Sequence, residues 1–344
     1  MKQNYLFLCF LVIYLTTTLS SQAQEIKNAQ WISRDTSATP LHIIAYWNKG
    51  DVKKYRARKL SYQYLGDSLI SQKTEFDAIV QFQVIDSTEQ SYNLEYRMIE
   101  NKRDLSNDPT LPYEALNLSE DDLTLYYTTD ETGAMEGYKN REMIERGLDK
   151  MMKEVVNGEL KKKSYKDEAE KKLTESLASK LANGKVLFDN VYHVFVSQFH
   201  TLHGYATGIN DTLNFTESVP GLIGDKTIDL NCYLYVTSID TTSYEVRYDV
   251  EKYADLNEFM NGYAKSLQET AKEAGVKPTT DLQNQLEKMD MKVEAYSSHY
   301  IDMGSGWPTF IKVTRLVTAK DLATQIVSTK EEIWALDTNL EDSN

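Results

Sequence analysis

Apolar and polar residues alternate through much of this chain, and this period-two pattern is typical of β-strands. In one stretch the alternate positions are all apolar: Phe76, Ala78, Val80, Phe82 and Val84. Successive side chains of a strand point to opposite faces, so such a run presents one apolar face to a core. A second alternating run covers 92–98, and the residues between the two runs, 86–88, have turn chemistry. The two runs are therefore predicted to form a hairpin.

The same patterns predict further strands at both ends of the chain and helices in its middle. Strands are expected within 41–100 and at 123–129, 226–240, 243–250, 292–301, 309–318 and 322–336. Helical spacing of apolar residues predicts helices at 140–157, 164–183, 187–203, 256–274 and 280–289. Residues 24–40 and 204–224 have the composition of irregular segments. The expected fold is α+β, an extensive antiparallel β-sheet with helices packed on one side.

The sequence is divided into four predicted segments. They are a signal peptide (1–23), a strand-rich N-terminal half ending in a helix (24–160), a helical middle with a loop (161–224), and a strand-rich C-terminal half with an inserted helix (225–344). Residues 84–96 resemble residues 238–248, since each contains a strand, an Ile-Asp turn and a second strand bracketed by tyrosines. Two related halves would produce this likeness, and so would chance in a meander of hairpins.

The N-terminus has the layout of a secretory signal peptide. Lys2 precedes an apolar stretch at 5–15, and small residues at Ser21 and Ala23 predict cleavage after Ala23. The protein is therefore expected to be exported, to the periplasm or outside the cell. The apolar stretch is too short to span a bilayer comfortably. The sequence around Cys9 is a poor lipoprotein signal, so no stable membrane anchor is expected.

Charge and cysteine content restrict the partners and the means of stabilisation. The formal net charge is −14, which argues against nucleic acid and anionic membrane surfaces as partners. Cys232 is the only cysteine after the predicted cleavage site, so an internal disulfide is excluded. It shares one strand face with Leu234 and Val236, and we expect it to be buried as a small apolar side chain.

No motif predicts an enzymatic site or a cofactor. The glycines at 221–224 precede Lys226 with the wrong spacing for a phosphate loop, and a strand rather than a helix follows them. The segment Gly304-Ser305-Gly306 lacks the setting of a nucleophile elbow. Carboxylates are too numerous for any pair to be selected. We therefore expect a non-catalytic protein without a cofactor.

Histidines and tyrosines supply the remaining candidate sites. His193, His200 and His203 would share one face of a continuous helix, and His200 and His203 are close enough to share a metal ion. Histidines on a polar face or at a helix cap are the preferred interpretation. Even-spaced tyrosines on neighbouring strands would build a stabilising aromatic ladder or an aromatic surface for an apolar or sugar ligand. The tyrosines considered for the ligand surface are Tyr233, Tyr235, Tyr244, Tyr248, Tyr296 and Tyr300.

Three segments are similar to uncharacterised exported proteins typical of Bacteroidota. They are the signal end at 21–24, the Val219-Pro220-Gly221-Leu222 segment before a strand, and the Gly-Trp-Pro turn with its following strand at 304–315. The resemblance implies a secreted or envelope location and transfers no functional residue. At the level of architecture only, the expected fold also resembles periplasmic lipoprotein carriers, in which a curved antiparallel sheet holds acyl chains against helices.

These features favour an exported protein that binds an apolar or amphipathic ligand, a lipid or a glycan, without catalysis. Two alternatives stay open at this level. One is a hydrolase of an envelope polymer, which would need acids or histidines gathered in a cleft. The other is a structural or protein-interaction module, which would present a large apolar patch. The sequence does not specify an oligomeric state.

Overall fold

A computed structural model provides the structure of the protein. It describes residues 26–33, 40–101, 124–150, 168, 171–172, 184–220, 227–256, 272, 289–321, 325 and 327–338. The predicted signal peptide, and the predicted helices at 164–183, 256–274 and 280–289, lie almost entirely outside these residues.

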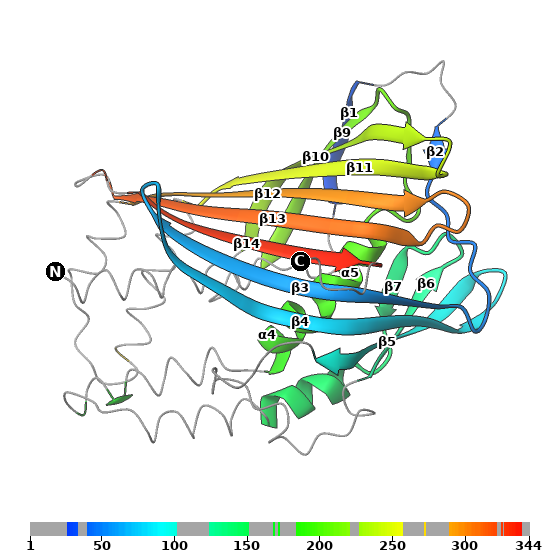
Figure 1. Cartoon of the computed structure of the whole chain (residues 1–344), viewed down its shortest axis with the longest axis horizontal. Coiled ribbons are helices and arrows are strands. Elements are labelled where there is room, and N and C mark those ends of the chain that lie inside the picture. The colour runs from blue at the N-terminus through cyan, green and yellow to red at the C-terminus, as the bar shows by residue number, and fades with distance from the viewer. Residues whose placement is uncertain are drawn as a thin grey trace.

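One curved sheet of twelve antiparallel strands dominates the described structure (Figure 1). Its strand order is β1-β9-β10-β11-β12-β13-β14-β3-β4-β5-β6-β7. The strands are β1 (Ile26–Ser33), β3 (Val52–Leu65), β4 (Ser68–Ser87), β5 (Ser91–Asn101), β6 (Leu125–Asp130), β7 (Met135–Tyr138), β9 (Thr212–Pro220), β10 (Thr227–Asp240), β11 (Glu245–Asp255), β12 (Met289–Asp302), β13 (Pro308–Asp321) and β14 (Val327–Asp337). A separate two-stranded sheet pairs β2 (Leu41–His42) with β8 (Ala206–Thr207).

Sequential hairpins build most of the sheet. The predicted hairpin at 76–98 is confirmed as β4 and β5, in which Phe82 pairs with Tyr96. The turn is held by Thr88, whose backbone N–H donates to the Ser91 carbonyl. Two meanders, β9 to β14 and β3 to β7, meet where β14 pairs with β3. The strand-rich ends of the chain thus join into one continuous sheet.

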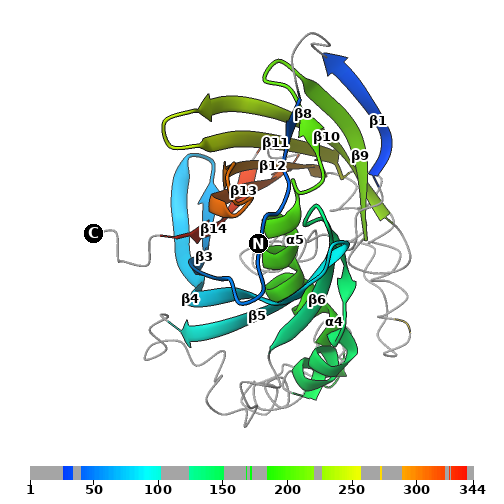
Figure 2. The same cartoon turned by 90° about the vertical axis from the view of Figure 1, so that its right-hand side faces the viewer.

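The α+β prediction is wrong, because the described structure is nearly all β. Of the described residues, 65% lie in strands and 14% in helices. Long strands explain this balance, since β4 alone has 20 residues and the sheet bends around on itself (Figure 2). The sheet supplies most of the described residues, and the few described helices lie inside its curve instead of forming a separate layer.

The described helices pack within the curve of the sheet. Residues 141–150 are helical, and α4 (Gly184–Phe188), the π-helical segment η3 (Asp189–His193) and α5 (Val194–His200) follow one another directly. The helix predicted at 187–203 is therefore confirmed over most of its length. Figure 2 shows α5 enclosed by the sheet. No described helix is both long enough and apolar enough to cross a membrane.

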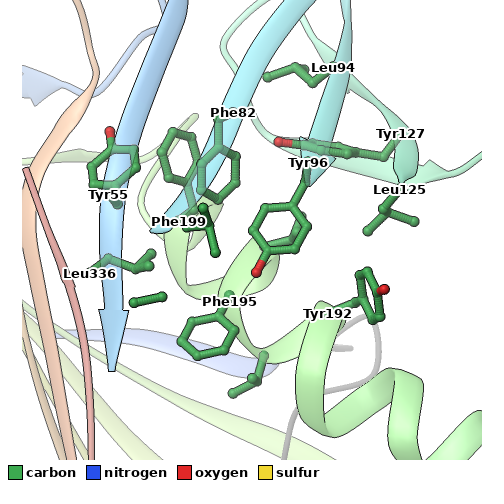
Figure 3. Packing of buried hydrophobic residues seen from close by; sticks show 14 of the residues in the cluster. Tyr55, Phe82, Leu94, Tyr96, Leu125, Tyr127, Tyr192, Phe195, Phe199 and Leu336 are labelled. Atoms are coloured by element: carbon green, nitrogen blue, oxygen red, sulfur yellow. The ribbon is translucent and has the colours of Figure 1, made fainter. Parts of the chain in front are cut away.

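Two apolar clusters form the core on the concave face. The larger contains α5 and strands β3 to β6, and Figure 3 shows its aromatic centre. There Phe199 of α5 stacks on Phe82 of β4 with ring centroids 4.1 Å apart. The other cluster covers β9 to β13 and includes Tyr248 and Val317. Burial of these side chains is the main source of stability, since each buried large side chain contributes about 1.5–3 kcal/mol.

Two segments predicted to be irregular contain strands instead. Strand β1 lies within residues 24–40, and β9 lies within 204–224. The two strands pair with each other, and β9 also pairs with β10. Neither segment was recognised because the hydrogen bonds that hold them come from partners distant in the sequence.

Gly306 allows the turn before β13 to lie directly against the 43–45 segment. Its φ is +73°, and a Cβ atom would lie 2.3 Å from the Ile44 carbonyl oxygen. We expect Gly306→Ala to lower the free energy of unfolding by about 3 kcal/mol, because a strained φ and a backbone clash act together. Urea denaturation measures this change. Gly50→Ala is the control, since Gly50 also has a positive φ, +93°, but open space around it. The control should lose only about 1–2 kcal/mol, and equal losses would contradict the steric argument.

Candidate functional site

A row of charged side chains crosses the concave face of the sheet between apolar positions. Across neighbouring strands Lys252 pairs with Ala295, Ala295 with Arg315, and Arg315 with Glu332. Adjacent charged residues extend this row at both ends. We call the group the charge belt, and its members are Lys59, Glu75, Glu217, Lys252, Arg315, Lys330 and Glu332.

Glu332 lies at the centre of the cations of the belt. Its Oε1 atom is 2.5 Å from Lys330 Nζ and 3.6 Å from Lys59 Nζ. Its Oε2 atom is 3.9 Å from Arg315 Nη1. The Glu332 side chain is completely buried. Because a buried carboxylate is costly without compensation, three cations around it are the arrangement expected for an ionised group.

Burial and neighbouring charge act in opposite directions on these groups. Burial raises the pKa of Glu332, but Lys59, Lys330 and Arg315 reverse this effect, so the pKa is lowered overall. Burial lowers the pKa of Lys59, yet Glu332 and Glu75 raise it above its ordinary value. For Arg315 burial outweighs the attraction of Glu332 and Glu217, and the pKa is lowered. The belt thus consists of ions that stabilise one another in a buried setting.

The other end of the belt contains Glu217 and Lys252, with Cys232 beside them. Lys252 Nζ lies 2.6 Å from Glu217 Oε2, and Cys232 Sγ lies 3.9 Å from the same oxygen. The prediction that Cys232 is a buried small side chain is confirmed, because it is fully buried in the apolar cluster of β9 to β13. Burial raises the pKa of the thiol to about 12, so the group is a poor nucleophile at neutral pH.

Apolar and aromatic side chains border the belt on both sides. On β13, Val313 and Val317 occupy the core-facing positions before and after Arg315. Trp334 precedes Leu336 on β14, and its ring lies 4.5 Å from the Arg315 guanidinium carbon and 5.3 Å from Lys59 Nζ. An indole ring attracts cations placed over its face. The concave face therefore combines the charge belt with apolar residues on either side of it.

The sequence contains a signal for the belt in the positions of its charged residues. In β13 the core-facing series is Ile311, Val313, Arg315, Val317 and Ala319. Arg315 thus occupies the apolar phase of an alternating strand. In the same way Lys330 and Glu332 precede Trp334 and Leu336 on one face of β14. Charges in the apolar phase of a strand indicate a buried ionic group.

The six candidate tyrosines do not gather at one site. Tyr248 is fully buried in the core, and Tyr244 is exposed in the β10–β11 turn with φ +56°. The other four lie on the convex face, opposite the belt: Tyr233, Tyr235, Tyr296 and Tyr300. Tyr253 lies between Tyr233 and Tyr296, at centroid distances of 6.3 and 6.0 Å. This near edge-to-face series is a cross-strand ladder, and a ligand-binding role for the tyrosines stays a prediction.

The three helix-face histidines lie in the core, so the preferred interpretation as polar-face or capping residues is wrong. His200 Nδ1 donates to the Gly133 carbonyl at 2.7 Å, and its Nε2 accepts from the Tyr127 hydroxyl at 2.9 Å. His193 bonds to the Tyr138 hydroxyl through Nδ1. His203 Nε2 donates to the Gly306 carbonyl at 2.9 Å. These bonds fix the rings as elements of the core.

His200 and His203 lie close together, without a third metal-binding side chain grouped with them among the described residues. Their ring centroids are 5.4 Å apart, but the Nε2 lone pair of His200 already accepts a hydrogen bond. Within the described part of the chain, no three His, Cys, Asp or Glu residues are grouped to hold a metal ion.

Comparison of the chain with protein-family models and with curated proteins finds no match.

Proposed function

We propose that this is an exported binding protein whose curved sheet receives an amphipathic ligand on its concave face. The observation that carries the proposal is the charge belt, which crosses a mostly apolar face of the sheet. A ligand with an apolar body and a polar group would match both parts of this face. This places the ligand on the face opposite the tyrosine ladder.

Accessibility within the belt supports this location. Ala295 faces the same side as Arg315 and Lys252, yet it is only half-buried, as is Lys252. Most other core-facing positions of β12 are buried, among them Val293 and Ser297. A short side chain that solvent reaches, set between long charged neighbours, is the position at which we expect a ligand to contact the belt.

A binding role fits the described groups better than hydrolysis. General acid-base catalysis needs a titratable group that can reach a substrate proton. His200 has both ring nitrogens engaged, and His193 and His203 are also buried. The carboxylate of Glu332 is surrounded by cations that keep it ionised. These side chains are arranged to hold charge and structure rather than to move protons.

Native mass spectrometry of protein purified without detergent from its own envelope tests the proposal. We expect a bound amphiphile on the unchanged protein. Ala295→Leu should remove it, because the larger side chain fills the space between Lys252 and Arg315. Thr314→Leu is the matched control on the convex face of β13 and should retain the ligand. Absence of any bound molecule from the unchanged protein, or equal retention by the two variants, would contradict the proposal.

A further inference from the structure

Within the charge belt, Ala295 lies between two cations. Along the row Lys252 lies on one side of Ala295 and Arg315 lies on the other. Each cation has a carboxylate close by, Glu217 at 2.6 Å from Lys252 and Glu332 at 3.9 Å from Arg315. Glu332 lies on β14, on the side of Arg315 away from Ala295. Glu217 belongs to β9, which is separated from β12 by two strands.

This order places two positive charges around a short, accessible side chain. Strands two apart in a sheet are separated by about 10 Å. Lysine and arginine side chains that flank such a gap can both reach a group placed over its centre. The flanking carboxylates stabilise the cations, and Glu217 acts on Arg315 as well as on Lys252. The row position between the two cations is an alanine, which carries no charge of its own.

Trp334 adds a donor beside Arg315. Its ring lies under the guanidinium group, and its indole N–H is buried without a hydrogen-bond acceptor among the described residues. An indole N–H can only donate. Trp334 lies on β14, on the side of Arg315 away from Ala295, so this donor favours acceptor oxygens near Arg315 but does not face the position over Ala295.

We propose that the ligand carries an anionic group, a carboxylate or a phosphate, that binds over Ala295 between Lys252 and Arg315. This inference rests on the proposed function and specifies the polar end of the ligand. Charge-assisted hydrogen bonds to guanidinium and ammonium groups are stronger than neutral ones. A cationic group at the same place would face two positive charges in a poorly solvated setting.

Four amphiphiles with the same alkyl chain test the sign of the charge. They are laurate, dodecyl phosphate, dodecyltrimethylammonium and dodecyl maltoside, titrated calorimetrically below their micellar concentrations. We expect laurate or dodecyl phosphate to bind at least about tenfold more tightly than the other two. The first two distinguish a carboxylate from a phosphate. Binding of none would overturn the proposed function, whereas equal binding of all four would overturn only this inference.

Variants of the two cations locate the effect. Arg315→Met and Lys252→Met should each reduce the affinity for the preferred anionic amphiphile about tenfold. Lys312→Met is the control, because Lys312 is an exposed cation on the convex face of β13. It should bind like the unchanged protein. An equal loss in Lys312→Met would show that the preference arises from overall charge and would overturn the location.

A second pair of variants tests the site through protein stability as well as through ligand binding. Ala295→Asp places a carboxylate between the two cations, and Ala295→Lys places a third cation there. We expect Ala295→Asp to keep the midpoint of urea denaturation near that of the unchanged protein and to abolish the preference for anionic amphiphiles. Ala295→Lys should lower the midpoint clearly. Equal destabilisation by both substitutions would contradict an anion site at this position.

Discussion

Acidification from about pH 7 to about pH 5 is expected to lower the free energy of unfolding by several kcal/mol, because four histidines are buried in neutral form. Burial is the main cause in each. It lowers the pKa of His193 and of His299 to about 3 and that of His203 to about 4, and it holds the pKa of His200 well below its ordinary value.

The sign follows from proton binding in the two states. Unfolded histidines titrate near pH 6.5, so between that pH and the folded pKa the unfolded chain binds more protons. Stability is therefore full above about pH 7 and decreases as the pH falls through 6.5 toward 4. Each histidine that stays neutral accounts for about 2 kcal/mol between pH 7 and pH 5. Neighbouring charges act in both directions, since Lys252 opposes protonation of His299 and Asp130 favours that of His203.

Urea denaturation followed by tryptophan fluorescence at a series of pH values measures this dependence. His299→Gln should be less stable at neutral pH, but its loss on acidification should be about 2 kcal/mol smaller. His42→Gln replaces an exposed histidine and should follow the curve of the unchanged protein. A stability that is constant between pH 7 and pH 5 would show that these rings are not held neutral in the core.

Replacing Glu332 is expected to be the most destabilising single change in the charge belt. Glu332→Gln keeps the shape but leaves Lys59, Lys330 and Arg315 without their shared carboxylate. Loss of one member of a buried ionic group typically costs about 3–5 kcal/mol, because the remaining charges stay desolvated. Guanidinium chloride denaturation measures the change in the free energy of unfolding.

Two further variants distinguish the effect of an uncompensated buried charge from the effect of any substitution in β14. Glu331→Gln changes the neighbouring residue, which faces the other side of the sheet beside Tyr64, and should cost less than about 1 kcal/mol. Lys330→Met with Glu332→Met removes one charge of each sign. We expect the double variant to lose less free energy of unfolding than the sum of the losses in the two single variants. In the double variant, neither charge of the pair is left buried without its partner. Strict additivity would show that the close pair is not coupled.

Features within one strand could be predicted from the sequence, because they depend on neighbours in the chain. The alternation at 76–84 correctly indicated a strand with one buried face, and Cys232 was correctly placed beside Leu234 and Val236. The helix at 187–203 could be recognised from its apolar spacing. The histidines on it could not be assigned correctly, because their burial depends on Tyr127, Tyr138 and Gly306 of other elements.

The sequence by itself determined the local alternation, the absence of an internal disulfide after the predicted cleavage site, and which side chains share a face of each strand. Only the tertiary structure decided that β14 pairs with β3 and that β1 pairs with β9. The registers between β11 and β14, also set only in the folded sheet, align Lys252, Ala295, Arg315 and Glu332 in one row. The physical reason is that pairing between strands depends on the burial of a whole sheet face and on backbone hydrogen bonds between distant segments. Neither the burial of a whole face nor the hydrogen bonds between distant segments can be deduced from a short stretch of sequence.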